Sequence, residues 1–333
     1  MNTKGILGIF SPRVTSKVIS FTLALVITLG SAKVYEALAK KDTLGDGNNG
    51  GVTDTGSVSE TAKGDGKDHF SDEGAKTLSG EYASDCVLVL DSNKMNIIAE
   101  KNKEKVISCG DLSLFAVALL TSRAIDSGRI TENEYAVCPA SAQKRPGYQL
   151  SSAILSVGKR MTVGDILRCM IYQQGAAFAY TLAVHISGSE EAFLSELNAL
   201  MGDLKTVNTA FASVCGDDDG ISKTTVSDAT VIIRAFLSDK RLREMLCSGE
   251  GLAIKNSEET SSVYLTVKND FFVSCCTEGQ AKADGILGGK VGIVGDEKWA
   301  VVLFEKEGAE YLIISVGCRS PYSEALRLFA AFV

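Results

Sequence analysis

The chain has 333 residues, of which 45% are hydrophobic and 23% are charged, the composition of a globular protein with one large domain or two smaller ones. Its formal net charge of −7 argues against a nucleic-acid partner, because contacts to phosphates need a basic face. The two histidines, His69 and His185, are too few for a multi-histidine metal site and give no support to a Ser-His-Asp triad. We predict no metal and no cofactor.

The N-terminal residues predict export. Residues 1–17 carry Lys4, Arg13 and Lys17 but no acid, and the apolar run "VISFTLALVITLG" follows them. A run of this length after a basic segment is typical of a signal peptide or, with its flanks, of a signal anchor. We expect residues 18–35 to be one of the two. The basic segment then stays in the cytoplasm, and the rest is extracytoplasmic, either membrane-anchored or secreted after cleavage.

Residues 41–80 are rich in Gly, Asp and Ser and poor in apolar side chains. This composition cannot bury a core, so we predict a disordered linker that precedes a folded domain over 81–333. The nine cysteines are an odd number without any C-x-x-C pair, and Cys86 and Cys169 lie inside apolar runs. These features predict buried free thiols rather than a disulfide framework.

The folded domain begins with two predicted strands over 86–100, joined by an Asp-Ser-Asn turn. Residues 111–126 are apolar nearly all round, which predicts a buried helix. A helical subdomain over about 129–240 follows. Within it, 161–189 predicts two helices that break at "QQG", the first of them capped by Thr162. Further amphipathic helices are predicted over 189–204 and 224–239.

Strand patterns then return as "SSVYLTV", "GGKVGIV", "KWAVVLFE" and "YLIISVG", and "KEGA" predicts a tight hairpin between the last two. A helix closes the chain over 320–333, with Ser320 as its cap and Pro321 at its first position. The order of strands, helices, strands and helix predicts an α/β (α+β) fold in which a helical block is inserted into a sheet domain.

Three stretches carry a resemblance to a known family: "CVLVLDSNKMNIIAEKNKEKVISCGDLSLFAVALL", "MTVGDILRCMIYQQGAAFAYTLAVHISGSEEAF" and "GILGGKVGIVGDEKWAVVLF". In order and spacing they resemble the serine-type D-alanyl-D-alanine carboxypeptidases of peptidase family S11, the low-molecular-mass penicillin-binding proteins. The resemblance spans about 81–333. It implies the DD-peptidase/β-lactamase-like fold, an antiparallel sheet flanked by helices with an inserted all-helical subdomain and an active site between the two parts.

The first family motif, S-x-x-K, opens the buried helix. The resemblance implies that its serine attacks the penultimate D-alanine carbonyl and that the lysine one turn later accepts the proton. In this chain Asp111 stands at the position of the nucleophile and Leu114 at that of the base. We interpret Asp111 as an N-cap. Ser113 would point about 200° away around the helix, and no lysine follows it at the right spacing.

The second motif, S-x-N, aligns with Gln174-Gly175-Ala176. In the family its serine relays protons and its asparagine holds the substrate peptide, so both functional side chains are lost here. The third motif, K-T/S-G, aligns with "KVG" at 290–292. In the family its lysine supplies positive potential and its hydroxyl binds the substrate's terminal carboxylate. Valine keeps the shape of threonine and removes that hydrogen bond.

A ligand could still be contacted by the polar and small residues that remain at the second and third motifs. We name Gln174, Lys290 and Gly292 as candidates, and Lys290 is otherwise an ordinary lysine of an edge strand. The literal pattern S-x-x-K occurs once, from Ser156 to Lys159, in a loop-like stretch without a buried helix. We interpret it as a chance match.

The catalytic positions are therefore degenerate at Asp111, Leu114, Gln174, Ala176 and Val291. Our leading hypothesis is a pseudoenzyme of the cell envelope that binds peptidoglycan stem peptides or a partner protein without hydrolysis. The alternatives are an active serine-type D-Ala-D-Ala carboxypeptidase and a structural scaffold of the envelope. We expect no nucleic-acid partner, and we expect the N-terminal segment to provide the contact with the membrane.

Overall fold

The computed structural model describes residues 70–333, with the exception of 217–220, 256–263 and 295–296. The segments predicted over 1–17 and 18–35 lie outside the described residues, as does most of the predicted linker. Among the residues described, no helix combines the length and the apolar character that a bilayer crossing requires.

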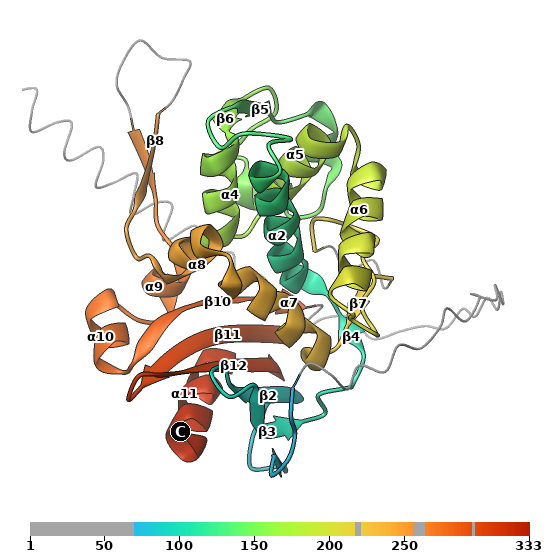
Figure 1. Cartoon of the computed structure of the whole chain (residues 1–333). Coiled ribbons are helices and arrows are strands. Elements are labelled where there is room, and N and C mark those ends of the chain that lie inside the picture. The colour runs from blue at the N-terminus through green and yellow to red at the C-terminus, as the bar shows by residue number, and fades with distance from the viewer. Residues whose placement is uncertain (1–69, 217–220, 256–263, 295–296) are drawn as a thin grey trace, which may run out of the picture. The chain divides into compact units, whose positions relative to one another are not determined.

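A six-stranded sheet organises the described part (Figure 1). Its spatial order is β1, β3, β2, β12, β11, β10, and each neighbouring pair is antiparallel except β1 with β3. The hairpin predicted at "KEGA" joins β11 to β12 and is confirmed. The strands are β1 Lys76–Thr77, β2 Cys86–Asp91, β3 Asn96–Lys101, β10 Ile286–Val294, β11 Glu297–Lys306 and β12 Ala309–Cys318.

Strand β1 shows that the fold begins before residue 81. Lys76 pairs with Ala99 of β3, and the side chain of Leu78 is buried in the core on one face of the sheet. The predicted linker over 41–80 is therefore wrong for its last residues. The polar composition of this segment gave no sign of the short strand or of the one buried leucine.

The sheet separates two hydrophobic cores. Successive side chains of a strand point to opposite faces, so Leu88 of β2 packs against the helical region while Val89 packs on the side of α11 (Pro321–Phe332). On that side the rings of Phe304 and Phe329 stack with 4.2 Å between their centroids. Helices, sheet and helix form three layers, which confirms the predicted fold class.

Helix α2 (Ser113–Asp126) runs through the middle of the helical layer (Figure 1). A 3-10 turn, Gly110–Leu112, leads into it. Contacts with α4, α5, α6, α7 and α8 surround α2, which explains why its sequence is apolar nearly all round. The surrounding helices are α4 Val163–Tyr172, α5 Ala176–Ser187, α6 Glu190–Asp203, α7 Val226–Ser238 and α8 Lys240–Cys247.

Side-chain caps fix where these helices begin. The Thr162 hydroxyl accepts a hydrogen bond from the Asp165 amide at 3.1 Å, as predicted. Ser189 caps α6 in the same way. Ser320 makes no such bond, although Pro321 does open α11 as expected.

Short elements connect the larger ones, and the nine cysteines, all in the described part, are free thiols, as predicted. The short elements are β4 Ile107–Ser108, β5 Tyr135–Val137, a 3-10 turn Ala140–Lys144, α3 Tyr148–Ser151, β6 Arg160–Thr162, β7 Lys223–Thr224, β8 Leu252–Lys255, β9 Tyr264–Val267, α9 Asp270–Ser274 and α10 Glu278–Ala283.

Candidate functional site

The 3-10 turn before α2 lies against the edge strand β10, and Asp111 of that turn reaches the strand. Its Oδ2 accepts a hydrogen bond from the backbone N–H of Ile293 at 3.3 Å. Asp111 is not the predicted N-cap. The cap positions of the turn and of α2 are Cys109 and Leu112, and neither makes a side-chain cap bond. The helical backbone already begins at Gly110, so residue 111 lies inside the turn and not at its cap position. The carboxylate of Asp111 bonds to strand β10 instead.

The two residues that follow in the motif are buried in the core. Ser113 is fully buried, which agrees with the expectation that it points away from the site. Leu114 is also buried and belongs to the core between the helices and the sheet. The position that the sequence alignment assigns to the base therefore carries a buried hydrocarbon side chain, which cannot accept a proton.

Lys290 of β10 is buried against the end of α4. Its Nζ donates hydrogen bonds to the backbone carbonyls of Ile171 at 2.9 Å and of Met170 and Gln173 at 3.3 Å. The last carbonyls of a helix have no partner within the helix and form the negative end of its dipole, so a cation is favourable there. Lys290 thus ties the helical region to the sheet, a role that differs from both sequence interpretations.

Two carboxylates affect the pKa of Lys290. Burial lowers the pKa of Lys290 to about 8, while the charges of Asp111 and Asp270 act in the opposite direction. Asp270, the first residue of α9, is half-buried, and burial raises the pKa of its carboxyl to about 6 against the opposing effect of Lys290. Sequence reasoning missed Asp270, because it belongs to none of the three motifs.

Gln174, at the second motif, also bonds to the edge of β10. Its Nε2 donates to the carbonyl oxygen of Val291 at 3.4 Å. The side-chain amide of the neighbouring Gln173 donates a hydrogen bond to a different acceptor, the carbonyl oxygen of Lys268, at 3.4 Å. Gln174 therefore lies beside β10, and its bond goes to the protein's own strand.

The bonded atoms of Val291 and Ile293 lie on the same edge of β10, because residues two apart in a strand direct their backbone groups to the same side. An exposed strand edge of this kind can receive an extended peptide as an additional strand. In this protein the side chains of Gln174 and Asp111 bond to the edge instead. We call these contacts, with those of Lys290, the β10 contacts.

Gly175, between α4 and α5, is required by close packing. Its φ of +146° is one that other residues rarely adopt, and a Cβ there would lie 2.3 Å from Cβ of Ser151. The hydroxyl of Ser151 accepts a hydrogen bond from the backbone N–H of Ala177 at 3.2 Å. A serine from α3 thereby caps the first turn of α5, which sequence spacing could not reveal. Ala176 is buried beside it.

Gly292, a predicted ligand contact, also has a packing role. It pairs with Trp299 of β11, and a Cβ on Gly292 would lie 2.5 Å from Cζ2 of the indole. Trp299 is fully buried, so the ring cannot move away without opening the core. The glycine of the third motif therefore makes room for this tryptophan.

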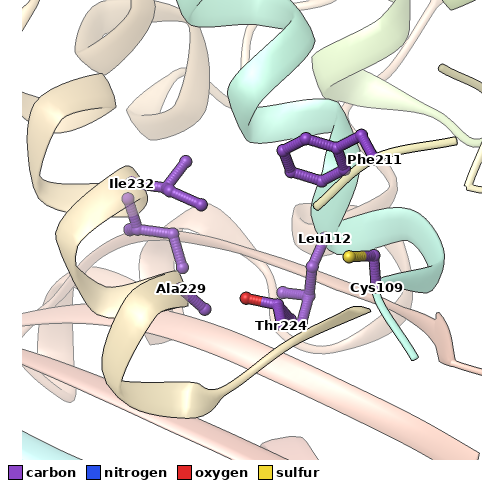
Figure 2. Close-up of a pocket in the computed structure, with 7 residues that line it drawn as sticks. Cys109, Leu112, Phe211, Thr224, Ala229 and Ile232 are labelled. Carbon is purple, nitrogen blue, oxygen red and sulfur yellow. The ribbon is translucent and has the colours of Figure 1, made fainter. Parts of the chain in front are cut away.

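A small cavity of about 10 Å³ lies beneath the 3-10 turn, between Cys109, Leu112, Phe211 and the first turns of α7 (Figure 2). Its lining is almost entirely apolar, and Thr224 supplies the one hydroxyl that Figure 2 shows. A volume of this size holds at most one water molecule. The cavity is therefore a packing defect and not a ligand site.

The literal S-x-x-K pattern lies in a turn, where the amide of Lys159 donates to the carbonyl of Ser156 at 3.0 Å. It is not part of a helix, in agreement with its interpretation as a chance match. The described residues contain no group of three or more His, Cys, Asp or Glu side chains that could hold a metal ion.

Proteins of known sequence resemble this chain. A family model described as D-alanyl-D-alanine carboxypeptidase matches residues 73–273. The D-alanyl-D-alanine carboxypeptidase DacF of Bacillus subtilis is 23% identical over 236 residues, which cover 71% of this chain and 57% of the relative. DacC of Escherichia coli is 24% identical over 155 residues, covering 46% of this chain and 39% of the relative. The chain thus spans little more than half of the first relative and less of the second.

Solved structures share the fold. A D-alanyl-D-alanine carboxypeptidase from Mycobacterium tuberculosis aligns with a TM-score of 0.64 at 17% identity, covering 77% of this chain and 92% of that one. A mutant of the Streptomyces K15 DD-transpeptidase aligns with a TM-score of 0.66 at 18% identity, covering 75% of this chain and 97% of that one. Because the family model matches more than half of its residues, the chain belongs to the D-alanyl-D-alanine carboxypeptidase family of serine peptidases.

Proposed function

We propose that this chain is a family member that does not hydrolyse D-Ala-D-Ala peptides and acts at the cell envelope by binding peptidoglycan stem peptides or a partner protein. The proposal is carried by Asp111 and Leu114 at the start of α2. Acyl transfer needs a nucleophile and a base at these two positions. A carboxylate bonded to the N–H of Ile293 and a buried alkyl chain supply neither.

The expected loss of rate is large. In another serine hydrolase, removal of the nucleophile alone lowers kcat by roughly a million-fold, about 8 kcal/mol of activation free energy. This chain also lacks the base at residue 114 and the relay serine at residue 174. Such losses are not additive, but the remaining hydrogen-bond donors stabilise only part of the charge that develops in the transition state.

The β10 contacts define how a peptide could bind. A peptide that adds to β10 must displace Gln174 from the Val291 carbonyl and Asp111 from the Ile293 amide. A single hydrogen bond of this type contributes about 1 kcal/mol. A peptide that forms the same bonds can therefore displace them, but the protein's own side chains compete with it and weaken the complex.

A second candidate is an active serine-type D-Ala-D-Ala carboxypeptidase. Membership in the family favours it, since the matched relatives carry this activity in their names. In that case a serine outside the aligned motif would have to become acylated. The two candidates differ in one observable, because only an acylated serine forms a covalent bond with penicillin that survives denaturation.

The test is labelling with fluorescent penicillin, followed by a denaturing gel, on the folded chain beside DacF of Bacillus subtilis as the positive control. We expect a band for DacF and none for this chain. A band would establish the active alternative. Titration with a stem peptide that ends in D-Ala-D-Ala then tests binding, and the absence of any heat signal at millimolar peptide would leave only a partner protein or a scaffold role.

We also propose an extracytoplasmic location, in which residues 18–35 either anchor the chain in the membrane or are a signal peptide that is cleaved. The sequence of the N-terminal region and the family support it. Fractionation of cells that produce the whole chain or a form without residues 1–35 tests this. We expect the whole chain in the membrane or outside the cell and the shortened form in the cytoplasm, and equal distribution of the two forms would refute the proposal.

A further inference from the structure

One surface segment has a charge opposite to that of the whole chain. Residues 137–160 contain no Asp or Glu, although the chain as a whole carries a net charge of −7. The same segment contains four basic residues, Lys144, Arg145, Lys159 and Arg160. This asymmetry does not depend on the proposed function.

The fold gathers the segment into one tip, which we define as residues 135–160. Strands β5 and β6 pair so that Val137 lies opposite Arg160, and the Cys138 amide donates to the Lys159 carbonyl at 3.0 Å. The amide of Val157 donates to the phenol oxygen of Tyr148 at 3.0 Å, which brings α3 to the pair. Figure 1 shows β5 and β6 at the end of the helical region that lies away from the sheet.

The tip also exposes apolar side chains. The exposed fractions are 53% for Tyr135, 50% for Val137, 47% for Leu150 and 38% for Val157. These are four of the eight large hydrophobic side chains that are exposed among the described residues. Scattered single apolar residues are normal on a surface, whereas half of the exposed large hydrophobic side chains of the described part lie on this one segment.

The basic charges of the tip are only partly neutralised. Arg145 pairs with the buried Glu190. Lys144 and Arg160 are exposed and form no ion pair with any described residue, and Arg160 lies over the ring of Tyr135 at 5.1 Å from its centroid.

Two acids near the tip already have other partners. Glu134, beside β5, bonds His185 at 2.7 Å between Oε1 and Nε2. Glu132 pairs with Arg241 of α8. The positive charge of Lys144 and Arg160 is therefore available to a ligand outside the protein.

We propose that the tip docks onto a bilayer surface that contains anionic lipids. Exposed aliphatic side chains together with Lys and Arg match a surface with an apolar interior and negative headgroups. Tyr135 beneath Arg160 adds an aromatic ring of the kind that lies at the level of the headgroups. A soluble polyanion would use the two charges but would leave Val137, Leu150 and Val157 in water.

The experiment introduces one tryptophan reporter into the whole chain, reconstituted with vesicles. Leu150→Trp places the reporter on the tip, and Val273→Trp on α9 is the matched control, because both native side chains are 47% exposed. Trp299 is fully buried and common to both proteins. The vesicles are phosphatidylcholine alone or an equal mixture with phosphatidylglycerol, in each case with brominated phosphatidylcholine as the quencher.

We expect the emission of Leu150→Trp to shift to the blue and to be quenched on the anionic vesicles and not on phosphatidylcholine, while Val273→Trp stays unchanged. A basic side chain near an anionic surface contributes enough to change partitioning about fivefold. Lys144→Gln and Arg160→Gln should each reduce the quenching of the Leu150→Trp reporter by about that factor. Lys282→Gln, an exposed lysine of α10, should have no effect.

Equal quenching of both reporters, or no quenching of Leu150→Trp on anionic vesicles, would overturn the proposal. If soluble polyphosphate instead binds in a manner that depends on Lys144 and Arg160 while Leu150→Trp stays unquenched, the partner is a polyanion and the lipid assignment is wrong. Circular dichroism of each variant confirms that it is folded before the vesicle measurement.

Discussion

The ammonium group of Lys290 lies 2.9 Å from the carbonyl oxygen of Ile171, at the end of helix α4. This contact joins the edge strand of the sheet to the helical region. Lys290 thus holds the two parts of the fold together, and both the stability of the chain and its access to peptides should depend on this contact and its neighbours.

The pH dependence of stability should reveal the charge of Lys290. Its pKa is lowered to about 8 in the folded protein from an ordinary value of 10.5. Between these values the unfolded chain binds the proton and the folded chain has lost it, so the unfolding free energy contributed by this group rises with pH. Below pH 8 both states are protonated, and this group adds no slope.

The measurement is urea unfolding of the native protein and of Lys290→Met at several pH values. We expect the difference in unfolding free energy, native minus variant, to rise from about pH 8 to about pH 10.5 and to be constant below. A difference that stays constant across the whole range, or falls, would contradict the buried position of this charge.

Removal of the Gln174 side chain should free the edge of β10. Gln174→Ala breaks the bond to the Val291 carbonyl, and we expect a stem peptide ending in D-Ala-D-Ala to bind about fivefold more tightly, the equivalent of about 1 kcal/mol. Titration calorimetry measures this. Gln173→Ala is the control, because that amide bonds to Lys268 instead, and an equal gain in both variants would argue against competition at the strand edge.

Alanine at Gly292 should destabilise the protein. Its Cβ would lie 2.5 Å from the fully buried indole of Trp299, and overpacking of this kind costs about 1–3 kcal/mol. Gly279→Ala in α10 is the control, since a Cβ there meets nothing within 4 Å and alanine favours a helix by about 0.5–1 kcal/mol. Urea unfolding of both variants measures the change in stability. An unchanged midpoint for Gly292→Ala would contradict the predicted destabilisation.

Restoration of the motif residues should restore acylation. The variant combines Asp111→Ser, Leu114→Lys, Gln174→Ser, Ala176→Asn and Val291→Thr. We expect a weak band with labelled penicillin, since Leu114 is buried and a lysine there loses favourable hydration. The control keeps the other four changes and carries Asp111→Ala, which removes the nucleophile and should abolish the band. A folded variant without a band would show that the cleft has also changed shape.

The layers of the fold could be predicted because they follow from local patterns. Thr162 caps α4 as expected, since a cap depends on residues three apart in the sequence. The nearly all-round apolar character of α2 predicted its burial. The small strand β1 was missed, because only its pairing with β3 makes a strand of "KT" within a polar segment.

The candidate site was predicted in its positions and not in its contacts. The motif alignment brought Asp111, Gln174 and Lys290 together, and the structure places all three at β10. That Asp111 bonds Ile293 rather than capping its helix depends on a contact 182 residues away in the chain. The cap that Ser151 provides for α5 likewise depends on packing between separate elements.

The nine free thiols give the protein an internal reporter of unfolding. Burial raises the pKa of Cys247 to about 11 and of Cys275 to about 12, and it raises the pKa of Cys169 further. A protonated thiol reacts slowly with alkylating agents, so these sulfurs are protected in the native state and become reactive when the chain opens. A pulse of iodoacetamide read by mass spectrometry would therefore show, cysteine by cysteine, which layer opens first under stress.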